Sequence, residues 1–273
     1  MSEVVSGKHQ QIIELEWANY AATRMPARVT PGLDLVLRDD VVITGSRLLP
    51  IPDANHACLV RSSEWAVEDL IAEVIAYFRE RKVSPTFYLS PACVPDDLPE
   101  RLTARGFSRQ PDEEAWMILP DILDLEVPRP TPNVVVQSIE REEVPLFVGV
   151  FLEAFGMPSE FAPPFVELLE PSVGLENAWH CIAYDGDQPI GTCSLLTYEQ
   201  YGVLGSAGIV RSRRGAGQRR IWSSPQWEKA RRQGVNMLML QTTAGTLLER
   251  FLRIRGFERI FTRTCYVLSE SAD

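Results

Sequence analysis

The sequence has few of the residues that build metal or disulfide sites, and it lacks a membrane-spanning run. Only three histidines are present, and the five cysteines are scattered, with no CxxC pair. We therefore expect no zinc or disulfide framework and interpret the cysteines as ordinary buried thiols. No apolar run reaches the roughly 18 residues of a membrane-spanning helix. The start of the chain lacks the basic-then-apolar order of a signal peptide, so we expect a cytoplasmic protein.

Positive charge is scarce as well. The chain has 27 Lys and Arg against 37 Asp and Glu, a formal net charge of -10. Nucleic acid and membrane surfaces need a cationic face, so neither is expected as the main partner. With 273 residues, 45% of them hydrophobic, the chain can bury two ordinary cores.

A proline-rich stretch divides the chain. Pro120 to Asn133 holds four prolines and no helical periodicity, which predicts an extended linker. The prediction is a domain over residues 1–125 and a second over residues 133–273.

Both segments end in the same order of elements, namely helix, strand, helix, Arg-Gly-Phe and strand. The two copies of Arg-Gly-Phe are Arg105-Gly106-Phe107 and Arg255-Gly256-Phe257. The matched order favours an internal duplication of one α/β unit. Chance is the alternative, because glycine commonly follows a helix. The predicted elements are helices or strands over residues 71–82, 85–90, 98–107 and 115–119, and over residues 226–234, 235–243, 247–257 and 264–268.

The second segment begins with further elements. Residues 134–138 are predicted as a strand, and residues 140–155 have apolar side chains at helical spacing. Residues 180–184 and 190–196 are predicted as a hairpin around Asp185-Gly186-Asp187, followed by a strand over residues 203–210. A further helix is predicted over residues 10–21. The expected class is α/β (α+β), with mixed sheets.

One loop concentrates features that suit a phosphate. A strand ends at Ile209 and Val210, a glycine-containing turn follows, and a helix begins after it. Glycines and a helix N-terminus can direct several N–H groups at one anion. The segment also holds five arginines between positions 211 and 220 and no acid. Neither the dinucleotide fingerprint nor the P-loop motif is present. A solvated basic turn is the alternative interpretation.

The same segment resembles the GNAT acyltransferases, whose pattern is a strand, then [R/Q]-x-x-G-x-[G/A], then a helix. Here Arg214-Gly215-Ala216-Gly217-Gln218-Arg219 stands at that place. The elements on both sides also resemble the family, from Phe151-Leu152-Glu153-Ala154-Phe155-Gly156 to the terminal Gly-Phe and closing strand. The resemblance implies two GNAT-like mixed-sheet domains in tandem and a sheet that splays open near Val210. It also implies acetyl-CoA as co-substrate, with the pyrophosphate on the N–H groups of residues 214–219. Expected cofactor-binding residues are Ile209, Val210, Arg211, Arg214, Gly215, Ala216, Gly217, Gln218 and Arg219.

The sequence departs from the family pattern at four places. Arg219 replaces a small residue, and its side chain could crowd the pyrophosphate or pair with it. Ser223-Ser224-Pro225 interrupts the following helix, which could start or restart there. Leu252 stands where many members have a Tyr that acts as the acid for the leaving thiolate. Gly245 stands where they often have Asn. Leucine cannot protonate a leaving thiolate.

The sequence therefore does not identify the general acid or the general base of the reaction. For the acid we consider Tyr266, with Tyr198 and Tyr201 as alternatives, although each is also explained as an ordinary aromatic. For the base, Glu153 is the first choice, followed by Glu170 and Glu199, each also explained as a solvated carboxylate. His180 is interpreted as structural.

The first segment has a different loop at the matching place. Residues 61–69 contain no glycine and three acids, and carboxylates repel a pyrophosphate. We therefore expect a degenerate GNAT-like domain without CoA that shapes the acceptor cleft.

The leading hypothesis is an N-acyltransferase that moves an acetyl group from acetyl-CoA to a small-molecule or peptide amine, by direct attack as the family implies. A non-catalytic CoA-binding or regulatory protein and a pure interaction module are the alternatives. The duplication is compatible with a monomer or a homodimer.

Overall fold

The computed structural model describes residues 2–126, 133–214 and 225–269, and the chain forms two compact units. Unit 1 comprises residues 1–21, 32–118 and 241–273, and unit 2 comprises residues 22–31 and 119–240. The units do not coincide with the predicted segments 1–125 and 133–273. The reason is strand pairing, since the last strand of the chain pairs with strands of the first segment.

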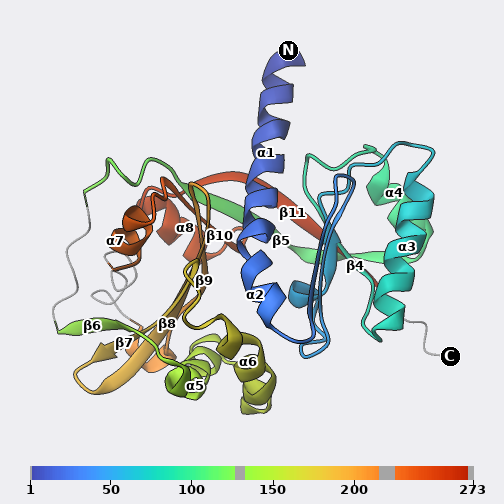
Figure 1. The fold of residues 1–273 in the computed structure, drawn as a ribbon. Coiled ribbons are helices and arrows are strands. Elements are labelled where there is room, and N and C mark those ends of the chain that lie inside the picture. Colours follow the sequence, from blue (N-terminus) through green and yellow to red (C-terminus); the bar gives the residue numbers. More distant parts are fainter. Residues whose placement is uncertain (1, 127–132, 215–224, 270–273) are drawn as a thin grey trace. The chain divides into compact units, whose positions relative to one another are not determined.

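Unit 1 is built on a mixed sheet with the strand order β1-β2-β3-β4-β11-β5 (Figure 1). The strands are β1 Leu33–Leu37, β2 Val42–Ser46, β3 His56–Cys58, β4 Thr86–Leu89, β5 Phe107–Leu119 and β11 Glu258–Leu268. The helices are α1 Ser2–Ala22, η1 Pro52–Ala54, α3 Val67–Glu80, α4 Leu98–Ala104 and α8 Leu247–Ile254. β11 lies antiparallel between β4 and β5, so the unit closes only with residues from the end of the chain.

The core of unit 1 follows from the helical periodicity of α3. Val67, Ile71, Val74 and Phe78 recur at helical spacing and are fully buried. They share one core cluster with strand residues such as Phe87. Burying one apolar face of a helix against a sheet is the main stabilising contribution in such a layer.

The strands of unit 2 follow one another in the sheet in the order β10-β9-β8-β7-β6. The strands are β6 Val134–Ser138, β7 Ala178–Asp185, β8 Gln188–Tyr198, β9 Tyr201–Ile209 and β10 Met237–Thr243, whose last residues belong to unit 1. The helices are α2 Arg24–Val29, η2 Arg141–Glu143, α5 Val144–Phe155, η3 Ser159–Phe161, α6 Ala162–Leu169, η4 Glu170–Ser172, η5 Arg211–Arg213 and α7 Pro225–Arg232.

The predicted element order is confirmed in both copies, as α3-β4-α4-β5 and as α7-β10-α8-β11. The helix predicted over residues 140–155 is a 3-10 turn followed by α5, with Pro145 in the first turn of α5. Gly156 ends α5 in the left-handed conformation, with φ of 67°. Pro225 lies in α7, whereas Ser223 and Ser224, where the helix was also predicted to start, lie outside the described residues.

The proline-rich linker is packed at its start. Ile122 is fully buried, and its N–H donates to the carbonyl of Asn236 over 2.9 Å. The Nε of Arg231, on α7, donates to the Ile122 carbonyl over 2.7 Å. The first part of the linker is therefore a fixed part of unit 2 rather than a free spacer. Residues 127–132 lie outside the described part of the chain.

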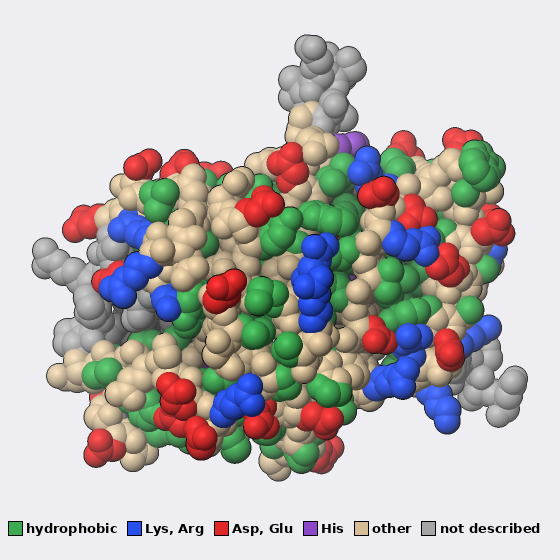
Figure 2. All heavy atoms as spheres, in the orientation of Figure 1, with side chains coloured by type: hydrophobic (Ala, Val, Ile, Leu, Met, Phe, Trp, Pro, Cys, Tyr) green, Lys and Arg blue, Asp and Glu red, His purple; other side chains and the backbone are tan. Residues whose placement is uncertain are grey.

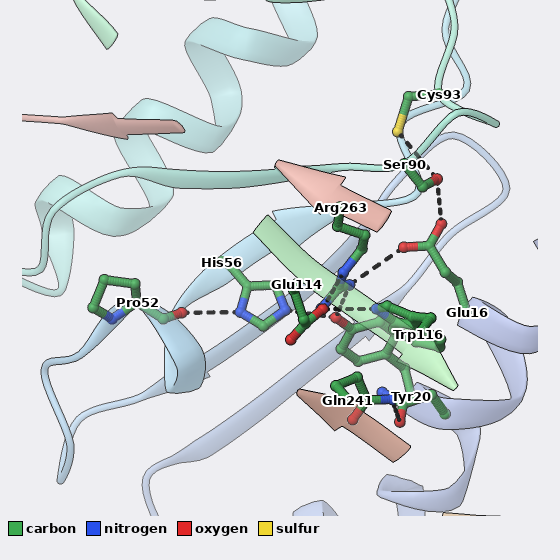
Figure 3. A network of polar contacts seen from close by, with 11 residues as sticks. Glu16, Tyr20, Pro52, His56, Ser90, Cys93, Glu114, Trp116, Gln241 and Arg263 are labelled. Atoms are coloured by element: carbon green, nitrogen blue, oxygen red, sulfur yellow. Dashed lines mark hydrogen bonds and ion pairs between the residues drawn. The ribbon is translucent and has the colours of Figure 1, made fainter. Parts of the chain in front are cut away.

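A buried guanidinium organises the interior of unit 1 (Figure 3). Arg263, on β11, is 3% exposed and forms ion pairs with Glu114 over 2.6 Å and with Glu16 over 3.3 Å. It also donates to the hydroxyl of Tyr20 over 2.7 Å, and its guanidinium lies 4.7 Å from the ring centre of Trp116. A buried cation needs such partners, because desolvation without them costs several kcal/mol. The network ties α1, β5 and β11 together.

Glu16 is the fully buried partner of this cation. Burial raises the pKa of Glu16, while Arg263 and the Ser90 hydroxyl oppose that rise. The Ser90 hydroxyl donates to the second carboxylate oxygen over 2.6 Å. Both oxygens of Glu16 are thus satisfied.

We found no helix long and apolar enough to cross a bilayer in the described residues. The face drawn in Figure 2 carries acidic and basic side chains interspersed with hydrophobic ones.

Substituting Arg263 tests the network. Arg263→Met should lower the free energy of unfolding by about 3–5 kcal/mol, because it leaves two carboxylates without their cation inside the unit. Urea denaturation followed by circular dichroism measures the change. Arg253→Met, at an exposed position of α8, is the control and should change the value by less than about 0.5 kcal/mol. Equal effects of the two substitutions would contradict the assigned role of Arg263.

Candidate active site

The parallel strands β9 and β10 of unit 2 pair over only a short stretch. Their register runs from Met237 opposite Tyr201 to Met239 opposite Val203. β9 continues to Ile209, and its residues 204–209 have no partner on β10 among the described residues. One edge of β9 is therefore open along its second half. Unpaired backbone groups at such an edge can accept a strand-like ligand.

A bulge in β9 sets the direction of its last peptide groups. The register with β8 shifts between Thr192 and Ser194, and Ser206 has a positive φ of 51°. The Thr192 hydroxyl donates to the Ser206 carbonyl over 2.8 Å and holds the bulge in place. Bulges are common next to binding sites because they redirect a strand.

Beyond the bulge, Ile209 and Val210 point their N–H groups in opposite directions. The N–H of Val210 donates to the Ile190 carbonyl over 2.9 Å, on the β8 side. Successive residues of a strand alternate, so the N–H of Ile209 faces the open edge. Of the two expected cofactor-binding residues Ile209 and Val210, Ile209 has the N–H that is free to bind a ligand. The N–H of Val210 is already used by β8.

Arg214 links the start of the predicted phosphate loop to two other elements. Its Nε donates to the carbonyl of Ile209 over 2.9 Å, and its Nη2 donates to the carbonyl of Ala154 in the last turn of α5. A cation suits the carbonyl end of a helix. Arg214 thus fixes the described start of this segment, residues 211–214, against β9 and α5.

The close approach of α5 to β9 depends on Gly208. A Cβ at this position would lie 2.8 Å from Cε2 of Phe155 and 3.0 Å from Cβ of Ala154. Gly208 is not among the residues predicted for the site. A glycine inside a strand pattern is nevertheless a signal for close packing.

The other arginines of the loop differ in their surroundings. Arg213 forms an ion pair with Asp185 over 3.0 Å. Arg211 is exposed and has no ion-pair partner among the described residues. The remaining predicted ligands, Gly215, Ala216, Gly217, Gln218 and Arg219, lie outside the described residues.

The matching parallel strands of unit 1, β3 and β4, have no free edge between them. They pair in parallel at Ala57 and Cys58, and the ladder resumes beyond β4 at Val94. The Val94 N–H donates to Val60 over 2.9 Å, and the Val94 carbonyl accepts from the Ser62 N–H over 3.2 Å. The described residues thus leave no open edge at this place in unit 1.

Structural comparison identifies the architecture. The sequence matches no protein-family model and no curated protein. A GCN5-related N-acetyltransferase from Kribbella flavida is 14% identical, with a TM-score of 0.62 over 93% of this chain and 96% of that chain. A tandem GNAT protein from the clavulanic acid biosynthesis pathway is 15% identical, with a TM-score of 0.61 over 97% of this chain and 96% of that chain. The chain has the tandem GNAT fold.

A third similar structure has no assigned activity. It is a conserved protein of unknown function from Staphylococcus epidermidis, 14% identical, with a TM-score of 0.63 over 91% of this chain and 98% of that chain. At these identities the similarity establishes the GNAT fold alone.

The position of the usual GNAT acid has a packing role here. Leu252 is 8% exposed and lies on α8, in unit 1. Gly245, at the position that often holds Asn, has φ of 77°, and its N–H donates to the buried Glu249 carboxylate over 2.6 Å. Both residues are explained by the start and the buried face of α8.

The candidate acids are placed away from Ile209 or in a core. Tyr266 is 7% exposed and belongs to the hydrophobic core of unit 1, so packing accounts for it. Tyr198 and Tyr201 face each other at the hairpin between β8 and β9. Tyr201 starts β9 and Ile209 ends it, a separation of roughly 26 Å at the usual rise of a strand.

The candidate bases are solvent-facing. Glu153 shares the exposed stripe of α5 with Leu146 and Gly149, opposite the face that packs on the sheet. Its role as the base stays a prediction. Glu199 lies in the hairpin turn beside Tyr201, and Glu170 is exposed on η4.

His180 is structural, as predicted. Its Nε2 and Nδ1 lie 2.8 Å from the hydroxyls of Ser172 and Ser194. Because the Ser172 hydroxyl donates to the Leu169 carbonyl, it accepts from Nε2–H, and Ser194 donates to Nδ1. The ring is therefore held neutral, and burial lowers the pKa of His180 to about 4.

This depressed pKa predicts a dependence of stability on pH. Between pH 6.5 and about 4 the unfolded chain binds a proton at His180 that the folded chain excludes, so the free energy of unfolding falls as the pH falls. The loss is on the order of 3 kcal/mol when the pH reaches the folded pKa. His180→Gln should flatten the profile over this range in urea denaturation at several pH values. His9→Gln, on α1, is the control, and an unchanged slope in His180→Gln would rule out this origin.

Proposed function

We propose that unit 2 binds acetyl-CoA and transfers its acetyl group to an amine. The observation that carries the proposal is the N–H of Ile209 at the open edge of β9, next to the loop positioned by Arg214. A fixed backbone donor of this kind can stabilise the oxygen of a tetrahedral intermediate. The GNAT fold of the similar structures supports the same chemistry.

The reaction is a direct attack on the thioester. The amine nitrogen forms a C–N bond with the acetyl carbonyl carbon while the oxygen accepts from the Ile209 N–H. The C–S bond then breaks, and the thiolate of CoA leaves. The ammonium form of the acceptor first loses a proton to water, which gives the neutral amine that attacks. After the attack the nitrogen loses a second proton to water, and the leaving thiolate takes one proton from water, because Leu252 offers none. No covalent acyl-enzyme is required.

Phosphate binding rests on backbone donors and on Arg211. Arg214 is held by two carbonyls and Arg213 by Asp185, whereas Arg211 is exposed. We assign to Arg211 the role of a direct phosphate contact and to Arg214 the positioning of the loop. Arginine suits phosphate because its planar fork donates two parallel hydrogen bonds.

A second candidate function is a non-catalytic CoA-binding protein. Leu252 and Gly245 favour it, since packing explains both positions and neither supplies an acid. The two functions share the CoA site and differ in turnover.

Calorimetric titration with acetyl-CoA tests the site. We expect micromolar binding at one site per chain, because the matching strands of unit 1 are closed. Arg214→Met should weaken binding by about tenfold, which corresponds to about 1.4 kcal/mol. Arg61→Met, at the matching loop of unit 1, is the control and should leave the affinity unchanged. Two sites per chain, or no binding at millimolar ligand, would contradict the proposal.

The pH dependence of turnover tests the absence of a side-chain base. With a saturating amine whose pKa is near 10, the rate of CoA release should rise by about tenfold per pH unit from 6.5 to 8.5, following the neutral amine. A plateau below pH 8 would indicate a base supplied by the protein. No CoA release at any pH, despite binding, would favour the non-catalytic function.

A further inference from the structure

Three phenylalanines form a continuous aromatic surface beside the open edge of β9. Phe155 and Phe151, on α5, have ring centres 4.7 Å apart, and Phe151 and Phe165, on α6, have ring centres 5.0 Å apart. We call these three side chains the aromatic column. Its first member is 51% exposed. The rings are tilted against each other, and Phe151 and Phe165 also pack against the core under α5 and α6. Phe155 therefore offers the exposed end of an otherwise packed aromatic surface.

The aromatic column starts at the backbone of β9. A Cβ at Gly208 would lie 2.8 Å from the Phe155 ring, so this ring rests on the strand one residue before Ile209. The same turn of α5 is held by Arg214 through the carbonyl of Ala154. The column is therefore fixed next to the N–H that the proposed reaction uses.

Helix α6 leaves apolar surface uncovered around the column. None of its residues is fully buried, although Phe165, Val166 and Leu169 are all apolar and half-buried. These side chains pack against the core of unit 2 on one side and keep part of their apolar surface free on the other, where a ligand can bind.

The surroundings of the column are acidic. Residues 140–170 contain seven glutamates and one arginine, Arg141. Helix α2, which lies beside η4, adds Arg24 and Arg28, and the end of β9 adds Arg211, Arg213 and Arg214. The seven glutamates still outnumber these six arginines, of which Arg213 pairs with Asp185 and Arg214 donates to two backbone carbonyls. Carboxylates lie among hydrophobic side chains over the part of unit 2 that contains α5 and α6 (Figure 2). A cation is attracted to such a surface before it is deprotonated.

We infer that the acceptor is a primary amine carried on an apolar, aromatic-sized body and lacking a carboxylate. This inference rests on the proposed function and names its substrate class. The aromatic body packs against Phe155 and Phe151, and the ammonium group is drawn in by the surrounding carboxylates. At the open edge of β9 the ammonium loses a proton to water, and the neutral nitrogen forms the C–N bond as the C–S bond of acetyl-CoA breaks.

A matched set of amines tests the class. 2-Phenylethylamine carries the ring and the cation, spermidine carries cations without a ring, and phenylalanine carries the same ring with an added carboxylate. We expect kcat/KM for 2-phenylethylamine, measured by release of the CoA thiol, to exceed the other two by about tenfold. Preference for spermidine would overturn the aromatic body, and preference for phenylalanine would overturn the charge argument.

Substitutions in the column provide the second measurement. Phe155→Ala and Phe165→Ala should raise KM for 2-phenylethylamine by about fivefold and leave the Kd of acetyl-CoA unchanged. Leu146→Ala, on the solvent-facing side of α5 and 42% exposed, is the control for loss of an exposed apolar side chain. Equal KM values in all three variants would overturn the role of the column.

The outcomes separate this inference from the proposed function. If the protein does not bind acetyl-CoA, the proposed function is wrong. Binding of acetyl-CoA with faster turnover of polar amines would overturn the acceptor class alone. If CoA binds without turnover, titration of 2-phenylethylamine into the CoA-loaded protein tests the acceptor class. If the amine does not bind there, the inference is overturned.

Discussion

The buried guanidinium of Arg263 is the constraint on which the first unit depends. It lies on a strand from the end of the chain, yet its partners Glu16 and Glu114 come from the first 120 residues. An unpaired buried charge is costly, so each carboxylate and the cation stabilise one another only when all three elements are in place. The unit therefore cannot be completed by a continuous stretch of sequence, and α1 is fixed by the same contacts that fix β11.

The two units show how one topology gives an open and a closed strand pair. In unit 1 the backbone of Val94 bridges Val60 and Ser62, so the ladder between neighbouring parallel strands is restored. In unit 2, β9 passes the end of its pairing with β10 and keeps its outer edge free. The local chemistry agrees with this difference. Glu68, in the first turn of α3, is paired with Arg101 and Arg105, whereas the matching loop of unit 2 is rich in arginine and glycine.

Local patterns in the sequence predicted most elements, because helical and strand periodicity are short-range properties. The strand over residues 134–138 and the repeated order of helices and strands are examples. The pairing of β11 with β4 and β5 was not predictable in this way, since hydrophobic periodicity carries no information about which distant strand is the partner. The placement of residues 241–273 in unit 1 rather than in the predicted second domain follows from that pairing.

In the candidate site, too, the sequence predicted the segment but not the contacts of its individual side chains and backbone groups. The loop at Arg214 was recognisable from its residues, but the use of its side chain to hold Ile209 and Ala154 was not. Composition suggested Glu153 and Tyr266 as reacting groups, while the structure explains the first by solvent exposure and the second by core packing. Likewise, alternation along β9 decides that the Ile209 N–H and not the Val210 N–H faces the open edge, and one inserted residue in the bulge would reverse that choice. The proposed acetyl transfer thus depends on backbone direction, which the bulge at Ser206 and the contacts of Arg214 set, more than on any titratable side chain among the candidates.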